Sequence, residues 1–503
     1  MTYAEALAAS VVRSVSVVLL GLAAAEVLAE WVRRSPSPGA RRMRLACLAL
    51  PFLTPNLVVG FGYRGVSLTL LNQPLWNELL YFALVSFELA PAAAWLLLFA
   101  SPPAVSAEGL ACARLVRCER GLGWRHWLDL WRRGPASQRF APAALLFLLS
   151  FQEPELASLM QVRSWTERVF TDHTRGLPAV ETIRLVLWPV LIQLAWLWPL
   201  LRQLRSARAW NLSEGARGAA AMACIRTLRG RTVSILAMFW TSLSIAFVLI
   251  APGVHLVRSI WHSGRTIALQ PMWIRELGDG LLLAVTCGGL AWCGAALAAA
   301  QWSAARRPVG GSGMRSEGLS LLLIMSMIPG LMGSLAIGLL TSATFQTLLP
   351  GLAYTPLPLV LAELIWVWPR AVVVQRALQS RQRIARRMLA LLETSPLKQQ
   401  QVSAIRLWWR VFGQAGAGGL LLVAWWTYLE LMLPTLLSLP GFQPAPMLLY
   451  NHLHYGQLAA LGVKLALILA IPAILAAVVG LGLRAVGRTL ARQPAGIPRN
   501  PGE

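Results

Sequence analysis

Long runs of apolar residues recur from one end of this 503-residue chain to the other, and they restrict the fold more than any other feature. Of all residues, 56% are hydrophobic and only 13% are charged, whereas a soluble domain carries about 25% charged residues. A run of about 20 apolar residues spans a bilayer as a helix. The sequence therefore predicts an all-α polytopic membrane protein.

Eleven segments have the length and hydropathy of transmembrane helices. They are residues 9–31, 45–62, 79–100, 140–160, 180–201, 233–253, 279–300, 318–340, 352–369, 413–436 and 458–483. Lysine and arginine are concentrated in every second connection between them. Residues 32–44, 101–139, 202–232, 301–317, 370–412 and 484–503 together hold 35 of the 45 basic residues. Since cytoplasmic loops carry such an excess, we expect the N-terminus outside and the C-terminus in the cytoplasm. The same segregation argues that the net charge of +24 serves membrane topology and not nucleic-acid binding.

Two stretches of the chain align without a gap at an offset of 277 residues. Residues 128–165 and 405–442 share seven identities in 38 positions, among them the pairs Trp131/Trp408 and Glu153/Glu430. Each stretch runs from an arginine-rich loop into an apolar helix with a carboxylate near its far end. This pattern indicates a duplicated unit.

The duplication predicts two halves. Residues 1–205 form the first half with five helices, 206–232 a cytoplasmic linker, 233–490 the second half with six helices, and 491–503 a cytoplasmic tail. The additional helix near 233–253 makes the repeat period six helices, so both copies have the same orientation. Parallel copies suit a pathway between the halves.

Several kinds of chemistry are excluded. A P-loop needs a glycine directly before its lysine, but the two lysines, Lys398 and Lys464, follow Leu397 and Val463. The chain also has no Ser/His/Asp arrangement, no zinc-protease motif and no dinucleotide fingerprint. We expect a protein that is not an enzyme and has no cofactor. If ATP powers it, a separate subunit hydrolyses the ATP.

The basic loop 370–412 has a helix–break–helix pattern. Residues before Ser395 favour an amphipathic helix, and Pro396 disfavours helix at the residue before it. A second helical stretch leads back to the membrane. This pattern fits a coupling element on the cytoplasmic surface, and it equally fits a solvated loop that only sets topology.

The second half also carries a longer motif. It combines Glu430 with Pro434-Thr435-Leu436-Leu437, Pro440-Gly441-Phe442 and the run from Tyr450 to Gly456. Matching positions in the first half are Glu153, Leu156, residues 161–166 and residues 176–178. This unit resembles the permease subunits of type I ABC importers, and more narrowly the fused two-half permeases of the iron(III) uptake group.

The resemblance implies a bacterial inner-membrane protein that forms the translocation path of an ATP-driven importer. It implies two cytoplasmic ABC ATPase subunits and an extracytoplasmic solute-binding protein as partners. It favours iron(III) as the solute and leaves thiamine, phosphonates and oxyanions open. The loops that dock the ATPases would contain Arg114, Gly121, Arg125, Arg387, Glu393, Ser395 and Pro396. The family's loop has a glycine where this chain has Glu393. No metal site in the chain itself is expected.

The acidic residues at membrane depth are Glu88, Glu153, Glu155, Glu363 and Glu430. Ionisable groups there are costly and usually face a cavity or a partner. Glu153 and Glu430 are the candidates for the translocation path, because they occupy matching repeat positions. The alternative is that each caps or pairs within its own half. Two other functions stay open: a proton-coupled secondary transporter, and a degenerate scaffold that does not transport.

Overall fold

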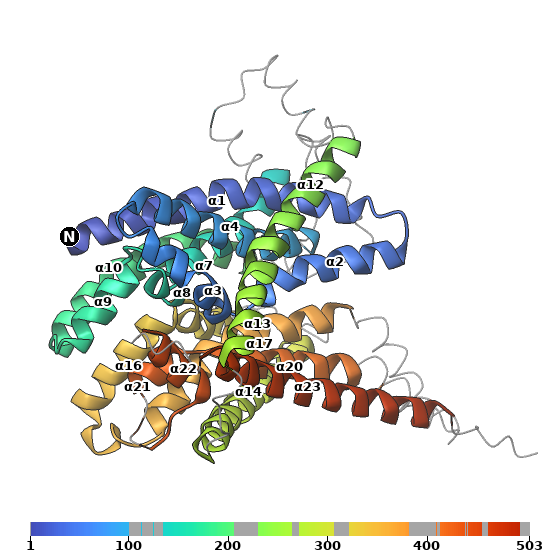
Figure 1. The fold of residues 1–503 in the computed structure, drawn as a ribbon. Coiled ribbons are helices and arrows are strands. Elements are labelled where there is room, and N and C mark those ends of the chain that lie inside the picture. The colour runs from blue at the N-terminus through green and yellow to red at the C-terminus, as the bar shows by residue number, and fades with distance from the viewer. Residues whose placement is uncertain are drawn as a thin grey trace, which may run out of the picture.

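The protein is helical throughout the part of the chain that the computed structural model describes (Figure 1). That part comprises residues 2–99, 112, 124, 134–205, 230–263, 271–305, 321–381, 409, 413–437, 439, 441–454 and 461–492. No strand occurs among these residues. The predicted all-α class is therefore confirmed.

Seven helices within the described ranges are long and apolar enough to cross a membrane. They cover Tyr3–Arg33, Pro74–Leu98, Val180–Trp198, Gly230–Trp261, Ile274–Gln301, Leu357–Leu378 and Leu461–Leu483. An eighth span results if α2 (Pro38–Leu53) and α3 (Asn56–Thr69), which are bent by 65°, are counted together. Large apolar side chains such as Leu19, Trp188 and Val478 are exposed on these helices, as contact with lipid requires. The chain is a multi-pass membrane protein, and the count of eleven spans stays a prediction.

Four of the predicted segments are interrupted helices. Segment 45–62 breaks before Pro55, and segment 140–160 breaks between α7 (Phe140–Phe151) and α8 (Glu155–Leu159) around Pro154. Proline lacks an N–H and disfavours helix before it. Segment 318–340 breaks at Gly333, whose φ of 87° suits glycine. Segment 413–436 breaks at Glu430, an extended residue between α20 (Gln414–Leu429) and α21 (Met432–Leu437). The prediction of single helices missed these breaks.

The same order of elements occurs twice. The first half, residues 2–205, contains α1 (Tyr3–Arg33), the broken pair α2 and α3, α4 (Pro74–Phe99), α7, α8, α9 (Trp165–Thr174) and α10 (Ala179–Arg205). The second half, residues 271–492, contains α14 (Pro271–Ala305), a helical turn that breaks before α16 (Ser334–Leu348), α17 (Leu357–Arg381), α20, α21, α22 (Ala445–His454) and α23 (Leu461–Arg492). In Figure 1 the first half lies above the second.

The helix contacts recur together with the order. In the first half α1 packs against α4 and α7, α3 packs against α8, and α10 packs against α7 and α9. In the second half α14 packs against α17 and α20, α16 against α21, and α23 against α20 and α22. The duplicated stretch found in the sequence is therefore one part of a larger repeated arrangement.

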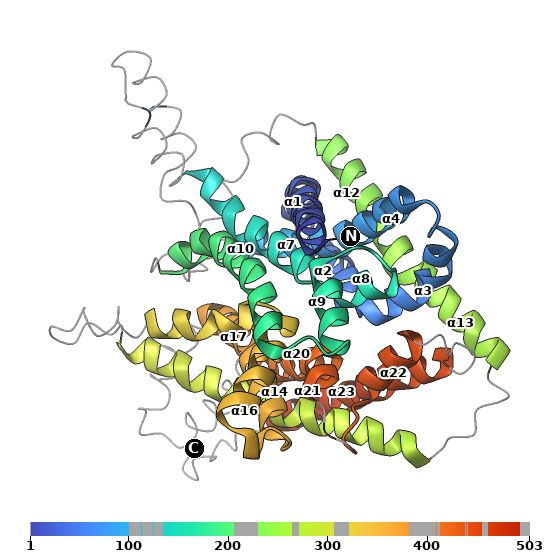
Figure 2. The ribbon, with the colours of Figure 1, turned by 90° about the vertical axis from the view of Figure 1, so that its left-hand side faces the viewer.

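An extra segment stands outside this repeat. It consists of α12 (Gly230–Ser244), a π-helical turn (Ile245–Ile250) and α13 (Ala251–Ser263). α12 packs on α1, α2 and α4 of the first half, whereas α13 packs on both α3 and α23 and so touches both halves. Figure 2 shows α13 running beside α3. The close approach depends on glycine: a Cβ on Gly62 would lie 2.6 Å from Cα of Pro252, and one on Gly462 would lie 2.3 Å from Oγ of Ser259.

Replacing Gly62 by alanine is expected to destabilise the protein by about 1–3 kcal/mol, because the new Cβ meets backbone that cannot move freely. Gly65 in the same helix has no atom within 4 Å of its Cβ position, so Gly65→Ala should be neutral or slightly stabilising. Thermal unfolding of the two variants in detergent measures the difference. Equal melting temperatures would contradict the proposed close packing.

Candidate functional site

The predicted ATPase-docking residues lie outside the described part of the chain. They fall in the gaps between the described ranges and are Arg114, Gly121, Arg125, Arg387, Glu393, Ser395 and Pro396. Their role stays a prediction from the resemblance. The candidate residues whose geometry can be described, Glu153 and Glu430, lie at helix breaks.

Glu153 sits in the break between α7 and α8. Its carboxylate accepts hydrogen bonds from the backbone N–H of Leu156 at 2.7 Å and of Ala157 at 3.0 Å, which are the first free donors of α8. It also accepts from Nδ2 of Asn56 at 3.2 Å and from the hydroxyl of Tyr81 at 3.1 Å. A carboxylate at a helix N-terminus satisfies orphan donors and faces the positive end of the dipole. Glu153 therefore ties α8 to α3 and α4.

Glu430 performs the same local task in the second half. It accepts hydrogen bonds from the backbone N–H of Met432 at 3.0 Å and of Leu433 at 3.4 Å, at the start of α21. The side chain of Ser334, the first residue of α16, is also hydrogen-bonded to it. The two halves therefore match in this contact. In the first half Asn56, the first residue of α3, bonds to Glu153, and in the second half Ser334, the first residue of α16, bonds to Glu430. Glu153 and Glu430 therefore each cap a helix within their own half, as the alternative hypothesis predicts. Their role in the translocation path stays a prediction.

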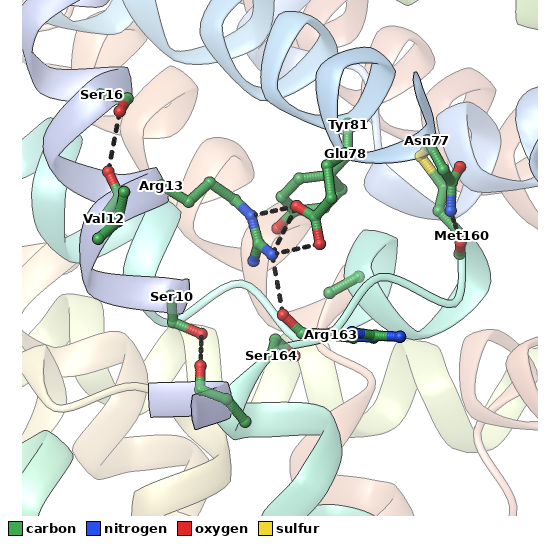
Figure 3. Close-up of polar contacts among 12 residues, drawn as sticks. Ser10, Val12, Arg13, Ser16, Asn77, Glu78, Tyr81, Met160, Arg163 and Ser164 are labelled. Carbon is green, nitrogen blue, oxygen red and sulfur yellow. Dashed lines mark hydrogen bonds and ion pairs between the residues drawn. The ribbon is translucent and has the colours of Figure 1, made fainter. Parts of the chain in front are cut away.

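A buried arginine joins α1 and α4 to the segment that follows α8 (Figure 3). Arg13 of α1 donates from Nε to Glu78 of α4 at 3.0 Å and from Nη2 to both carboxylate oxygens of Glu78. The same Nη2 donates to the backbone carbonyl of Arg163 at 2.8 Å, and the guanidinium lies 4.9 Å from the centre of the Tyr81 ring. Because Tyr81 in turn bonds to Glu153, the ion pair and the cap belong to one network. Arg13 was not singled out from the sequence, because its partner Glu78 lies 65 residues away along the chain.

Residues 160–164, which follow α8, are fixed by polar groups of α3 and α4. The carbonyl of Met160 accepts from the Ser67 hydroxyl and from Nδ2 of Asn77 at 2.8 Å (Figure 3). Gln161 has a φ of 52°, the one positive φ outside glycine within the described ranges. A non-glycine residue in this conformation persists when its surroundings hold it. The short helix α8 is therefore anchored at both ends.

The breaks of the two halves touch each other directly. Gln152, at the end of α7, donates from Nε2 to the carbonyl of Leu331 in the second half at 2.6 Å. Gly333 packs on the same side chain, since its Cβ position lies 3.1 Å from the Gln152 side chain. The α7–α8 break of the first half thus meets the break before α16 of the second half.

A cavity of about 160 Å³ lies at the two other breaks, the α2–α3 break of the first half and the α20–α21 break of the second half. Its wall includes the α2–α3 turn with Thr54 to Leu57, and the end of α20 with Leu429 to Leu431. Three carboxylates line it, those of Glu88, Glu155 and Glu430, together with three indoles, those of Trp366, Trp425 and Trp426. Of the two glutamates predicted for the translocation path, Glu430 lines this cavity and Glu153 is not among its lining residues.

Glu363 and Arg370 lie behind the cavity on α17. The guanidinium carbon of Arg370 lies 3.7 Å from the centre of the Trp366 ring. Arg370 also interacts electrostatically with two carboxylates, more strongly with Glu430 than with Glu363. Glu363 is completely buried, and neither of its carboxylate oxygens has a hydrogen-bond partner in the described structure. A buried carboxylate without partners is costly in its charged form.

Residues 450–454 of α22, the described part of the run that begins at Tyr450, lie at the contact between the halves. Tyr450 and Leu453 of α22 are buried in an apolar cluster that also contains Leu57 and Leu159 of the first half. His452 is half-buried. Burial is the main cause that lowers the pKa of its imidazole, and the positive charge of Lys464 is the smaller one. At neutral pH this histidine is therefore uncharged. Within the described ranges no group of three or more His, Cys, Asp or Glu residues could hold a metal ion.

No protein-family model, no curated protein and no solved structure matches this chain. The class of protein that the fold defines is therefore the multi-pass, all-helical membrane protein, and a more specific function has to be argued from the site.

Proposed function

We propose that this chain is the permease subunit of an ATP-driven importer in a bacterial inner membrane. The observation that carries the proposal is the repeated helical arrangement whose two copies meet at a cavity lined with carboxylates and indoles. A pathway between two equivalent halves is what such a subunit needs. The proposal includes eleven spans in two parallel repeats, an outside N-terminus and a cytoplasmic C-terminus.

In this function the chain performs no bond chemistry. Two separate ATPase subunits would bind the loops 101–139 and 370–412, and their closure on ATP would rock the halves about the breaks. A solute-binding protein would deliver its solute on the outer side. The broken helices support this mechanism, because a chain interrupted at Gly333 or Glu430 can change angle there without losing internal hydrogen bonds.

The test is reconstitution of the full chain with a P-loop ATPase encoded beside it. We expect the ATPase to co-purify, its activity to rise several-fold on binding, and proteoliposomes to take up solute only with ATP. Replacing Ser395 and Pro396 by alanine should reduce this stimulation, whereas alanine at Gln399 and Gln400 in the same loop should not. A chain that binds no P-loop partner would refute the importer.

A proton-coupled secondary transporter is the second candidate, and Glu363 is the observation that favours it. This carboxyl is buried without hydrogen-bond partners, as a proton-carrying group within a membrane protein can be. Uptake driven by a proton gradient without ATP would support this alternative. Failure of both ATP-driven and proton-driven uptake would favour a scaffold.

A further inference from the structure

The cavity between the halves has polar walls that offer acceptors and few donors. Glu88 and Glu155 have no hydrogen-bond or ion-pair partner in the described structure, and their electrostatic neighbours are other carboxylates, Glu153 and Glu430 among them. Asn56 also lines the cavity, and its buried Oδ1 has no donor within the described ranges. Arg370 interacts with Glu430 but is not an electrostatic neighbour of Glu88 or Glu155. The unmet requirement at this wall is for positive charge and donors.

The apolar part of the wall is aromatic. Trp366, Trp425 and Trp426 line the same cavity as the carboxylates. An indole face attracts a cation within about 6 Å, and the attraction reaches about 2 kcal/mol when water is excluded. Arg370 already occupies one such position over Trp366. One face of Trp425 is stacked on the Tyr428 ring, with 6.1 Å between the ring centres, so the other face of Trp425 and the ring of Trp426 are the candidates for a ligand. Carboxylates combined with indole faces are the surroundings that recognise a substituted ammonium group.

A bare metal ion fits this wall poorly. Hard cations such as Fe(III) take several oxygen ligands at once. Yet no three acidic, histidine or cysteine side chains of the described structure are grouped closely enough to hold one metal ion. The carboxylates are spread around a space of about 160 Å³, and a cavity of about 150 Å³ accommodates a molecule the size of benzene. The space suits a small organic cation whose charge is distributed over its surface.

We propose that this cavity binds the ammonium group of a small organic cation, and that such a cation is the solute of the transporter. The second part rests on the proposed function. Glu155 and Glu88 supply the negative charge once the cation is bound, because its positive charge offsets the cost of ionising carboxyls that otherwise lack partners. Trp425 and Trp426 supply the surfaces that pack against the alkyl groups of the cation. The solute implied by the resemblance, iron(III), is replaced by an organic cation in this proposal.

The experiment measures equilibrium binding of radiolabelled choline to the full chain in nanodiscs of phosphatidylglycerol, without any ATPase. We expect saturable binding, and no competition from 3,3-dimethyl-1-butanol, which has the shape of choline without its charge. Glu155→Gln and Trp425→Leu should each weaken binding by about tenfold or more. The exposed Glu181→Gln and Trp188→Leu on α10 are the matched controls and should bind as the unaltered chain does.

Each outcome decides the proposal. Equal competition by the uncharged analogue, or no choline binding by a folded chain, would overturn the cation site. Nanodiscs of phosphatidylcholine identify the source: unchanged binding indicates a free solute, whereas binding lost only there assigns the site to a lipid headgroup and overturns the solute role. ATP-driven uptake without choline binding refutes the cation site alone. Choline binding without ATP-driven uptake refutes the importer and keeps the site.

Discussion

Replacing Arg13 by methionine is expected to lower the free energy of unfolding by about 3 kcal/mol. Loss of one partner of a buried ion pair costs about 3–5 kcal/mol, because the other charge is left without compensation. The lower end applies, since the side chain of Arg13 is 8% exposed but that of Glu78 is 35% exposed. The substitution also removes the donor to the Arg163 carbonyl. Reversible unfolding in mixed micelles measures the change.

The control for Arg13 is Arg168, whose pair with Asp172 lies on the outside of α9. The Arg168 side chain is 42% exposed, so Arg168→Met should cost no more than about 1 kcal/mol. Adding Glu78→Gln to Arg13→Met should recover part of the lost stability, because no unpaired charge remains. Equal losses for the two arginines would contradict the structural role of Arg13.

The second large effect is expected at Glu153, where alanine should cost about 3–4 kcal/mol. The substitution leaves the N–H groups of Leu156 and Ala157 and the hydroxyl of Tyr81 without an acceptor, and each buried unsatisfied group costs about 1–3 kcal/mol. Full additivity is not expected, since Glu153 itself is only partly buried. The same unfolding titration measures the loss.

Glu155 provides a control two residues away. The Glu155 carboxylate has no hydrogen-bond partner in the described structure, so Glu155→Ala should leave the stability unchanged or raise it slightly. The pair thus separates a structural carboxylate from a ligand-binding one within a single short segment. If Glu155→Ala destabilises the protein as much as Glu153→Ala, the assignment of Glu153 as the cap of α8 is wrong.

The sequence predicted those features that depend on local pattern. Apolar run length located helices in all eleven segments, and the repeat identified Glu153 and Glu430 as a matched pair before any geometry was known. Pro55 and Pro154 also carried a local signal for two of the breaks, although it was not used. Gly333 and Glu430 give weaker signals, because glycine and glutamate both occur within membrane helices.

The partners of these residues could not be predicted, because they are distant along the chain. Arg13 meets Glu78 across 65 residues, and Gln152 meets Leu331 across 179 residues. Such pairs depend on which helix faces pack together, and a single apolar pattern does not specify that. The cavity is a further step removed, because Glu88, Glu155 and Trp425 come from three separate elements in two halves.

The extra helix α13 makes the two flanks of the molecule unequal. On one flank α10 packs directly against α16, whereas on the other flank α13 packs against both α3 and α23. Two identical copies of a single half would have two identical flanks and no place for one unpaired helix. Fusion of the halves into one chain therefore supplies one copy of α13 per molecule, and this copy makes the two flanks different.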